Sequence, residues 1–438
     1  GRTLTLHAPS FVTNNKRGAF FLGMRYNDKS TRECYTESIS KDGRAPLCGC
    51  ESDMKVIIAA DSFKGSCSAE EAVSAMERGV HKVFPDAQTV GIPVADGGEG
   101  TVDALVAATG GKKVCITAHD PLGRPISAEY GVLPDGTAVV ETAAASGLPR
   151  LRPEERDAFH ATSCGTGELI RHALEHGARR LILGLGGSAT TDGGMGLAQV
   201  LGVAFLDADG KALAPGGGSL ARLARIETDA IVPQAKDCTF VLACDVRNQL
   251  CGTEGAAAVF GPQKGATPEQ VALLDQALSR YASVLSSQLG SDAAQRDGAG
   301  AAGGIGCAMM AFFGASFLSG IDLVLDAAGF STAVAGADLV LTGEGRLDAQ
   351  SAYGKVPCGV ARRAKAVRNV PVLAIGGALG DGAESLYSCG VDALASTVSR
   401  ITTLESAMTN AVASIEEATA RTMRLLDAGR KMEQNKVS

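Results

Sequence analysis

The chain has 438 residues, and 45% of them are hydrophobic, so it can bury a large core and favours two or three domains. A formal net charge of −7 and a pI near 5.5 argue against a nucleic-acid surface, and the sequence has no Lys- and Arg-rich run with interleaved aromatic residues. We therefore expect a globular protein with no nucleic-acid partner.

The twelve cysteines are scattered from Cys34 to Cys389 and include no C-x-x-C pair. That spacing favours reduced thiols in the cytoplasm over a zinc site or a disulfide framework. The longest uncharged run, residues 298–321, contains seven glycines and lacks flanking basic residues. It predicts a buried glycine loop followed by a core helix, so we expect no membrane-spanning segment.

Residues 1–53 show neither a helical nor a strand period. Lys16 and Arg17 precede a short apolar stretch, but no small-residue cleavage site follows, so a signal peptide is not indicated. We predict that this segment is an N-terminal extension, disordered or artefactual, and that the first domain starts at Met54.

Residues 55–111 alternate between strand and helix patterns. A strand over 55–62 precedes a helix over 68–84, for which Ser68 is the expected N-cap and Glu71 completes a capping box. A second strand then leads through Gly97 and Gly98 into another helix that ends at glycine.

The middle of the chain has a more mixed pattern. A hairpin is predicted to turn at Asp135 and Gly136, and near-continuous apolar runs over 179–187 and 239–246 predict buried strands. From about residue 337 the alternation of strand and helix resumes and continues to a long C-terminal helix.

We infer an α/β fold with two domains. A discontinuous Rossmann-like parallel domain is predicted from residues 54–112 and 320–432. An inserted second α/β domain over 113–319 interrupts it, and the cleft between the two domains is the expected ligand site.

Polar side chains follow five of the predicted strands at their carboxyl ends, where parallel sheets bind ligands. Glycines there let backbone N–H groups approach a phosphate, whereas carboxylates need a metal ion between themselves and the phosphate. Glycine loops, aspartates and a few lysines together indicate Mg-ATP phosphoryl transfer. The segments are Asp61–Ser66, Asp96–Glu99, Gly186–Asp192, Asp245 and Gly343–Asp348.

Familiar nucleotide motifs do not explain these segments. No G-x-x-x-x-G-K-[ST] occurs, so a P-loop is not predicted. The G-x-G-x-x-G at 298–303 does not follow a predicted strand, which argues against a dinucleotide site.

Six motifs occur in the order that is typical of bacterial glycerate kinases: DSFKGS, ADGGEGT, GGSATTDGG, ACDVRNQLCG with AVFGPQKGA, GAGAAGGIG, and TGEGRLDAQSAYGKV with GVARRA. From about Met54 to Leu426 the chain resembles the bacterial glycerate kinase family, the type unrelated to P-loop and sugar-kinase folds. The resemblance implies an ATP-dependent kinase of D-glycerate that phosphorylates the 2-hydroxyl and gives 2-phosphoglycerate. Thr191 departs from the family, in which this position is commonly Asn.

The candidate site residues fall into four groups. Asp192 is the expected general base, Lys64 is expected to contact the substrate carboxylate or the transferring phosphate, and Asp245 is the next candidate base. The substrate-binding candidates are Ser62, Ser188, Thr190, Thr191 and Arg124. The candidates for ATP and phosphate are Gly97, Gly98, Gly343, Gly345, Lys264 and Lys355, and those for Mg²⁺ are Asp96, Glu99, Glu344 and Asp348.

Three alternatives stay open. The product could be 3-phosphoglycerate, or the chain could be a non-catalytic module that binds a small acid or a phosphosugar. Asp96 and Asp192 could also act only as helix caps, which Asp-Gly-Gly segments after strands often provide. Besides the small molecules D-glycerate and ATP, the one further partner we consider is a second copy of the chain in a homodimer.

Overall fold

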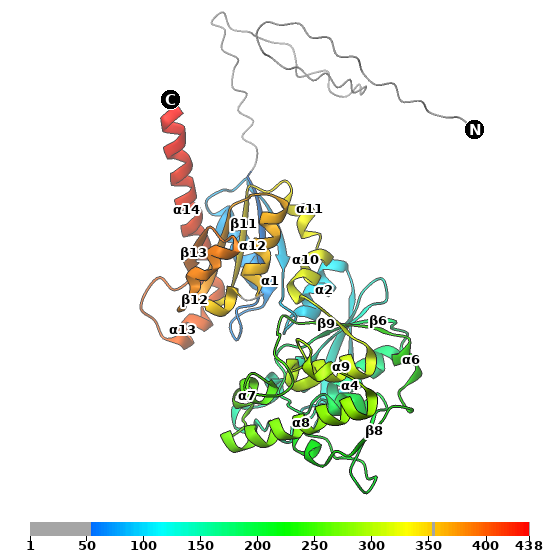
Figure 1. Cartoon of the computed structure of the whole chain (residues 1–438). Coiled ribbons are helices and arrows are strands. Elements are labelled where there is room, and N and C mark those ends of the chain that lie inside the picture. The colour runs from blue at the N-terminus through cyan, green and yellow to red at the C-terminus, as the bar shows by residue number, and fades with distance from the viewer. Residues whose placement is uncertain (1–53, 353–354, 438) are drawn as a thin grey trace, which may run out of the picture. The chain divides into compact units, whose positions relative to one another are not determined.

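The computed structural model describes residues 54–352 and 355–437, and Figure 1 shows the arrangement of their helices and strands. The predicted extension over 1–53 lies outside these residues. The described residues belong to one compact unit. Within them, no helix combines the length and the hydropathy that a membrane crossing requires.

The first sheet is entirely parallel, with strand order β13-β12-β11-β1-β2. From β1 the chain adds β2 on one side, and from β11 it adds β12 and β13 on the other side. The topological switch point therefore lies between β1 and β11, which is where open α/β sheets bind their ligands. The strands are β1 (Lys55–Ala60), β2 (Gln88–Pro93), β11 (Leu339–Leu347), β12 (Val372–Leu379) and β13 (Ala393–Ser396).

Successive strand residues point to opposite sides of this sheet, so its apolar residues reach both faces. Helices cover both of these faces. Val56 and Ile58 pack with one helix layer and Ile57 with the other. The predicted capping box of Ser68 and Glu71 is confirmed at the start of α1. One layer holds α1 (Ala69–His81) and α14 (Ala411–Val437), and the other holds α2 (Thr101–Thr109), α10 (Gly320–Ala327), α11 (Phe330–Val334) and α12 (Val356–Val367).

The second sheet is mixed, with order β10-β9-β6-β5-β4-β3. Its first four strands run parallel, and β4 and β3 are antiparallel to their neighbours, with the predicted turn at Asp135 and Gly136 between β4 and β5. The strands are β3 (Lys112–His119), β4 (Pro125–Val132), β5 (Ala138–Glu141), β6 (Arg180–Gly184), β9 (Thr239–Ala243) and β10 (Ser316–Leu318).

One face of the second sheet packs against α4, α5, α8 and α9, and the other shares a core with α2 and α10. The predicted glycine loop before a core helix is confirmed, since residues 298–304 lead into α9. The remaining elements are α3 (Thr142–Ser146), α4 (Cys164–Glu175), α5 (Met195–Val200), β7 (Ala204–Leu206), β8 (Arg225–Glu227), α6 (Pro233–Lys236), α7 (Ala256–Phe260), α8 (Pro268–Leu289), α9 (Ile305–Phe313) and α13 (Leu404–Thr409).

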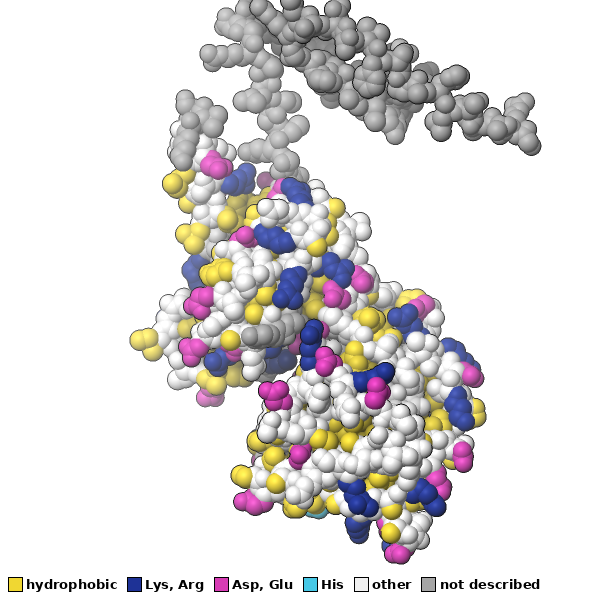
Figure 2. All heavy atoms as spheres, viewed as in Figure 1, with side chains coloured by type: hydrophobic (Ala, Val, Ile, Leu, Met, Phe, Trp, Pro, Cys, Tyr) yellow, Lys and Arg dark blue, Asp and Glu magenta, His cyan; other side chains and the backbone are white. Residues whose placement is uncertain are grey.

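The α/β fold class is thus confirmed. The strands of the first sheet come from both segments of the predicted discontinuous domain, and nearly all residues of the second sheet come from the predicted insert. The domain boundaries themselves stay a prediction. On the face in view in Figure 2, acidic and basic side chains are interspersed, so this face shows no large area of one charge.

Strand β11 is longer than its sequence pattern suggests. The sequence places Gly343–Asp348 after a strand, whereas β11 continues through Leu347 and pairs there with β12. A Cβ atom on Gly343 would lie 2.3 Å from the carbonyl oxygen of Ile375, so glycine at this position allows β11 and β12 to pack closely. This glycine therefore belongs to a strand and not to a loop.

Gly79 and Gly429 offer a matched test of helix packing. A Cβ on Gly79 of α1 would lie 2.5 Å from Thr419 Cβ of α14, whereas nothing lies within 4 Å of a Cβ on Gly429. Gly79→Ala should lower the free energy of unfolding by about 1–3 kcal/mol through overpacking. Gly429→Ala should raise it by up to about 1 kcal/mol, because alanine favours the helix. Urea denaturation measures both, and equal effects would contradict the close packing of α1 on α14.

Candidate active site

Four charged side chains gather at the carboxyl ends of the first sheet, and we call Asp61, Lys64, Asp96 and Glu344 the switch-point cluster. Asp61 and Lys64 follow β1, Asp96 follows β2, and Glu344 lies within β11. The charges of Asp96, Glu344 and Lys64 each affect the protonation of Asp61. The cluster therefore lies where the sheet reverses between β1 and β11, the expected ligand position.

The sequence analysis placed Asp61 in a predicted ligand-binding segment but gave it no role among the candidate site residues. It is only 3% exposed, and its Oδ1 accepts hydrogen bonds from the Ser62 backbone N–H at 2.7 Å and from the Ser62 hydroxyl at 3.3 Å. Burial and the nearby Asp96 raise the pKa of Asp61 to about 7. A charged residue at the end of a buried strand was the available signal, because it needs a compensating partner.

Lys64 is a cation among carboxylates. Burial alone would lower the pKa of Lys64. The charges of Asp96, Asp61, Glu344 and Glu99 together raise this pKa by more than burial lowers it, so it lies above its ordinary value. Lys64 is therefore charged at neutral pH. An exposed ammonium in this position can bind a phosphate or a carboxylate.

The predicted metal-binding residues Glu344 and Asp348 have different surroundings in the structure. Glu344 is 7% exposed and accepts a hydrogen bond from the Ser351 hydroxyl, and burial raises its pKa. Asp348 instead pairs with Arg346 at 3.2 Å and accepts the Gln350 N–H. Over residues 54–352 and 355–437, no three His, Cys, Asp or Glu side chains are already arranged to hold a metal ion.

The Asp96–Gly98 turn connects the cluster to the second sheet. Asp96 Oδ1 accepts the Gly98 N–H at 3.1 Å, and the Gly186 N–H donates to the Gly97 carbonyl at 3.3 Å. Gly97 has a φ of +92°, and a Cβ there would lie 2.5 Å from the Ala243 carbonyl oxygen. Glycine is required at this position for both reasons. The turn therefore packs directly against the ends of β6 and β9.

Asp245 follows β9 and lies close enough to Asp96 for their charges to interact. The pKa of Asp245 is raised to about 6, mainly by burial and also by the charge of Asp96, while a hydrogen bond from Ser319 opposes this shift. Its Oδ2 is buried and has no hydrogen-bond partner among the described residues. A buried carboxylate oxygen without a partner is costly, so this oxygen is available to a ligand.

Asp192 is fully buried and occupied by other groups. Its Oδ2 accepts the N–H and the hydroxyl of Ser163, both at 2.8 Å, and the Gly196 N–H at 3.1 Å, while Oδ1 accepts the Gly194 N–H at 3.1 Å. These bonds join the start of α5 to the start of α4. The assignment of Asp192 as general base stays a prediction, but its surroundings fit a structural role.

Lys264 is also buried, with 2% exposure. Its ammonium donates to Ser188 Oγ at 2.9 Å and to the Thr190 carbonyl at 2.7 Å, so it braces the Gly186–Asp192 loop. The hydroxyls of Thr190 and Thr191 are buried without a hydrogen-bond partner among the described residues.

The remaining predicted residues lie as follows. Arg124 is paired with Asp120 and with Glu155, the latter at 2.8 Å. Both of these carboxylates lie outside the switch-point cluster. Lys355 is the N-cap residue of α12, and its charge lowers the pKa of Glu344.

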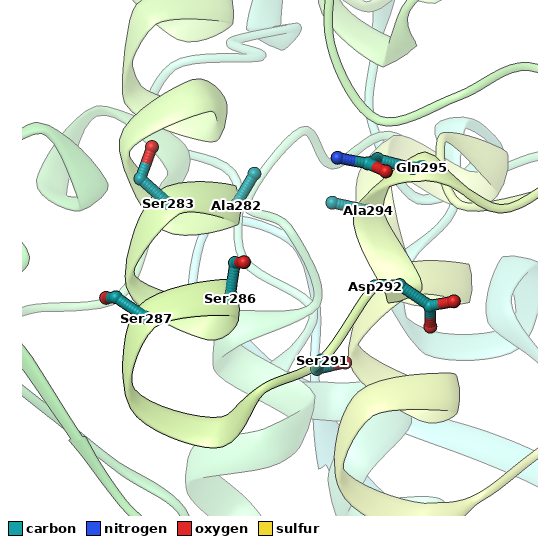
Figure 3. A pocket seen from close by; sticks show the side chains of 8 residues that line it. All are labelled: Ala282, Ser283, Ser286, Ser287, Ser291, Asp292, Ala294 and Gln295. Atoms are coloured by element: carbon teal, nitrogen blue, oxygen red, sulfur yellow. The ribbon is translucent and has the colours of Figure 1, made fainter.

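Two cavities lie near the surface. One of about 400 Å³ includes Glu99 and Glu141, the latter accepting the Val102 N–H at the start of α2 at 2.7 Å. The other, of about 340 Å³, is shown in Figure 3 and lies between α8, with Ala282 and Ser286, and the segment that carries Asp292 and Gln295. No residue of the predicted site lines this second cavity.

Comparison with known proteins places this arrangement in a class of kinases. The model of the glycerate kinase family matches residues 56–427. The chain is 48% identical to "Glycerate 2-kinase" of Escherichia coli (strain K12) over 359 residues, which cover 82% of this chain and 94% of the relative. It is also 48% identical to "Glycerate kinase" of Bacillus subtilis (strain 168), over 84% of this chain and 96% of the relative.

The crystal structure of a protein from Salmonella typhimurium LT2 is similar as well, with a TM-score of 0.75 and a sequence identity of 46%. The match covers 86% of this chain and 100% of the Salmonella chain. These matches define an α/β phosphotransferase. The chain belongs to the glycerate kinase family, which confirms the resemblance seen in its six motifs.

Asparagine variants of Asp192 and Asp245 test which of these two aspartates has a structural role and which a catalytic one. Asp192→Asn would point an amide at backbone donors that now bind a carboxylate, so it should lose about 2–4 kcal/mol of stability. Asp245→Asn should keep its melting temperature and lose about 10² to 10⁴ in turnover. Calorimetry and steady-state kinetics on both variants test this. A stable Asp192→Asn protein that binds glycerate but turns over poorly would instead support the prediction that Asp192 is the base.

Proposed function

We propose that the chain is an ATP-dependent kinase that transfers the γ-phosphoryl group to the 2-hydroxyl of D-glycerate. The observation that carries this proposal is the switch-point cluster, in which a charged lysine lies among carboxylates at the ligand end of a parallel sheet. Membership of the family supports the substrate, and the name of the Escherichia coli relative, glycerate 2-kinase, supports the 2-hydroxyl.

The two sheets supply different parts of the proposed reaction. Lys64 stabilises charge on the transferring phosphoryl group, which is the main task in phosphoryl transfer. Asp245 accepts the proton of the glycerate hydroxyl, because it combines an unpartnered carboxylate oxygen with a pKa of about 6. The Gly186–Asp192 loop binds glycerate through its backbone and Ser188.

Carboxylates of the cluster fit a magnesium ion. One or two of Asp61, Asp96 and Glu344 would contribute oxygen ligands, and a cation would offset both the burial and the repulsion from Asp96 that raise the pKa of Asp61. Mg²⁺ is commonly held by one or two carboxylates together with substrate phosphates, so no complete protein site is required. When bound, Mg²⁺ would neutralise charge on the phosphate oxygens. A cytoplasmic location and a homodimer stay predictions.

Product identity tests the regiochemistry. Incubation with D-glycerate, ATP and Mg²⁺ should give a product that enolase consumes directly, because enolase acts on 2-phosphoglycerate. A product that first requires phosphoglycerate mutase would assign the 3-hydroxyl. Excess chelator should abolish turnover. Glycerate binding without any phosphorylated product would support the non-catalytic alternative.

Lys64→Ala tests the proposed charge stabilisation. We expect a loss of at least about 10² in turnover, the scale of a removed transition-state donor. Lys211→Ala is the matched control, since Lys211 is an exposed lysine in the Asp207–Lys211 turn. If folded Lys64→Ala protein retains near-normal turnover, Lys64 is only a loop lysine.

A further inference from the structure

Two cysteine thiols are in contact in the helix layer that covers one face of the first sheet. Cys358 lies in the first turn of α12, and Cys389 ends the short helical turn Ala383–Cys389. Their Sγ atoms are 2.6 Å apart, although the two residues are 31 positions apart in the sequence. A disulfide bond needs an S–S distance of about 2.05 Å, so this pair requires only a small movement to form one.

This contact distinguishes the pair from the other cysteines. Among the described residues, no other two cysteine sulfurs are in hydrogen-bonding contact. Cys251 and Cys307 lie near enough for the charge of one to affect the other, but their sulfurs do not meet. Cys115 is exposed and has a serine hydroxyl as its neighbour. Oxidation of the folded chain should therefore join Cys358 to Cys389 and no other pair.

The two thiols differ in their access from solvent. Cys358 is fully buried, whereas Cys389 is 5% exposed, and its sulfur lies 4.0 Å from the guanidinium of the exposed residue Arg362. Attack on a dissolved oxidant needs an accessible sulfur. Cys389 is therefore the thiol that we expect to react first, and Cys358 is the thiol that completes the bond.

We propose that Cys358 and Cys389 are a redox pair that forms a reversible disulfide by exchange with a small disulfide such as oxidised glutathione. The Cys389 sulfur attacks one sulfur of the oxidant, which gives a mixed disulfide and releases one thiol. The Cys358 sulfur then attacks the Cys389 sulfur and displaces the second thiol. The two protein thiols are oxidised, and the two sulfurs of the oxidant are reduced and take up the two protein protons.

The same thiols support the turn that holds Glu344. Both sulfurs lie within hydrogen-bonding distance of the Ala352 carbonyl, Cys358 at 3.3 Å and Cys389 at 3.7 Å. Ala352 directly follows Ser351, whose hydroxyl donates to the Glu344 carboxylate. A disulfide has no S–H group, so oxidation removes both thiol donors from this turn.

A change in turnover follows if Glu344 acts in the site, and this consequence rests on the proposed function. Without the thiol donors, the turn holds the Ser351 hydroxyl less firmly against Glu344 of the switch-point cluster. We expect the oxidised enzyme to turn over about threefold to tenfold more slowly than the reduced enzyme, the scale of one lost hydrogen bond.

Peptide mapping of the full chain tests the disulfide itself. The chain is incubated with oxidised glutathione until the reaction no longer advances, and is then alkylated and digested with trypsin. The peptide of residues 356–362 should be joined to that of residues 369–400, and dithiothreitol should separate them. Cys358→Ser and Cys389→Ser should abolish the joined peptide, whereas the control Cys115→Ser should leave it unchanged.

The wild-type chain decides the proposal even where a serine variant does not fold. Recovery of Cys358 and Cys389 as separate alkylated peptides from the oxidised, folded chain would overturn it. Glutathione that remains attached to Cys389 would overturn it as well, because the second exchange step would not have taken place.

Turnover of the same samples tests the link to Glu344. A wild-type enzyme that slows on oxidation and recovers with dithiothreitol, beside a Cys389→Ser enzyme that does neither, would support the link. Equal turnover of the oxidised and reduced enzymes would overturn it. If the joined peptide forms but neither state phosphorylates glycerate, the proposed substrate is wrong and the redox pair is confirmed.

Discussion

No side chain fits between the Asp96–Gly98 turn and the second sheet, and the site depends on that contact. A Cβ on Gly186 would lie 2.4 Å from Gly98 Cα, and a Cβ on Gly320 would lie 2.3 Å from the Asp96 carbonyl oxygen. Backbone therefore meets backbone at this point. As a result Asp96, from the first sheet, comes near enough to Asp245, from the second, for the charge of Asp96 to raise the pKa of Asp245.

The site that forms there carries excess negative charge. Asp61 and Glu344 lie beside Asp96, and Lys64 is the cation that interacts with all three. Burial and the like charge of Asp96 raise the pKa of Asp61, so its ionised form is disfavoured in this cluster. Such an arrangement is typical of functional sites, where ligand binding relieves electrostatic strain that folding alone does not. A magnesium ion with a nucleotide would supply that relief, whereas a purely structural cluster would have paired each carboxylate.

Local interactions were readable from the sequence, and long-range ones were not. The capping box of Ser68 and Glu71 and the turn at Asp135 involve residues a few positions apart, so their pattern is visible in one window. Burial of Lys264 depends on a loop 76 residues away, and the donors that occupy Asp192 include Ser163, 29 residues earlier. No sequence window contains either pair. The motifs therefore predicted a site at the carboxyl ends of several strands, but could not say which polar residues face a ligand.

The pairing of β1 with β11 governs how the chain can assemble. Lys55 at the start of β1 bonds to Asp338, 283 residues later, so the central pair of the first sheet has a very high contact order. Every strand of the second sheet lies between Lys112 and Leu318, and that sheet can form while β11 is still being synthesised. Closing so long a loop adds little entropy cost beyond that of a shorter one. Until β11 arrives, however, β1 has an unpaired apolar edge, and during synthesis this edge is exposed to association with other chains.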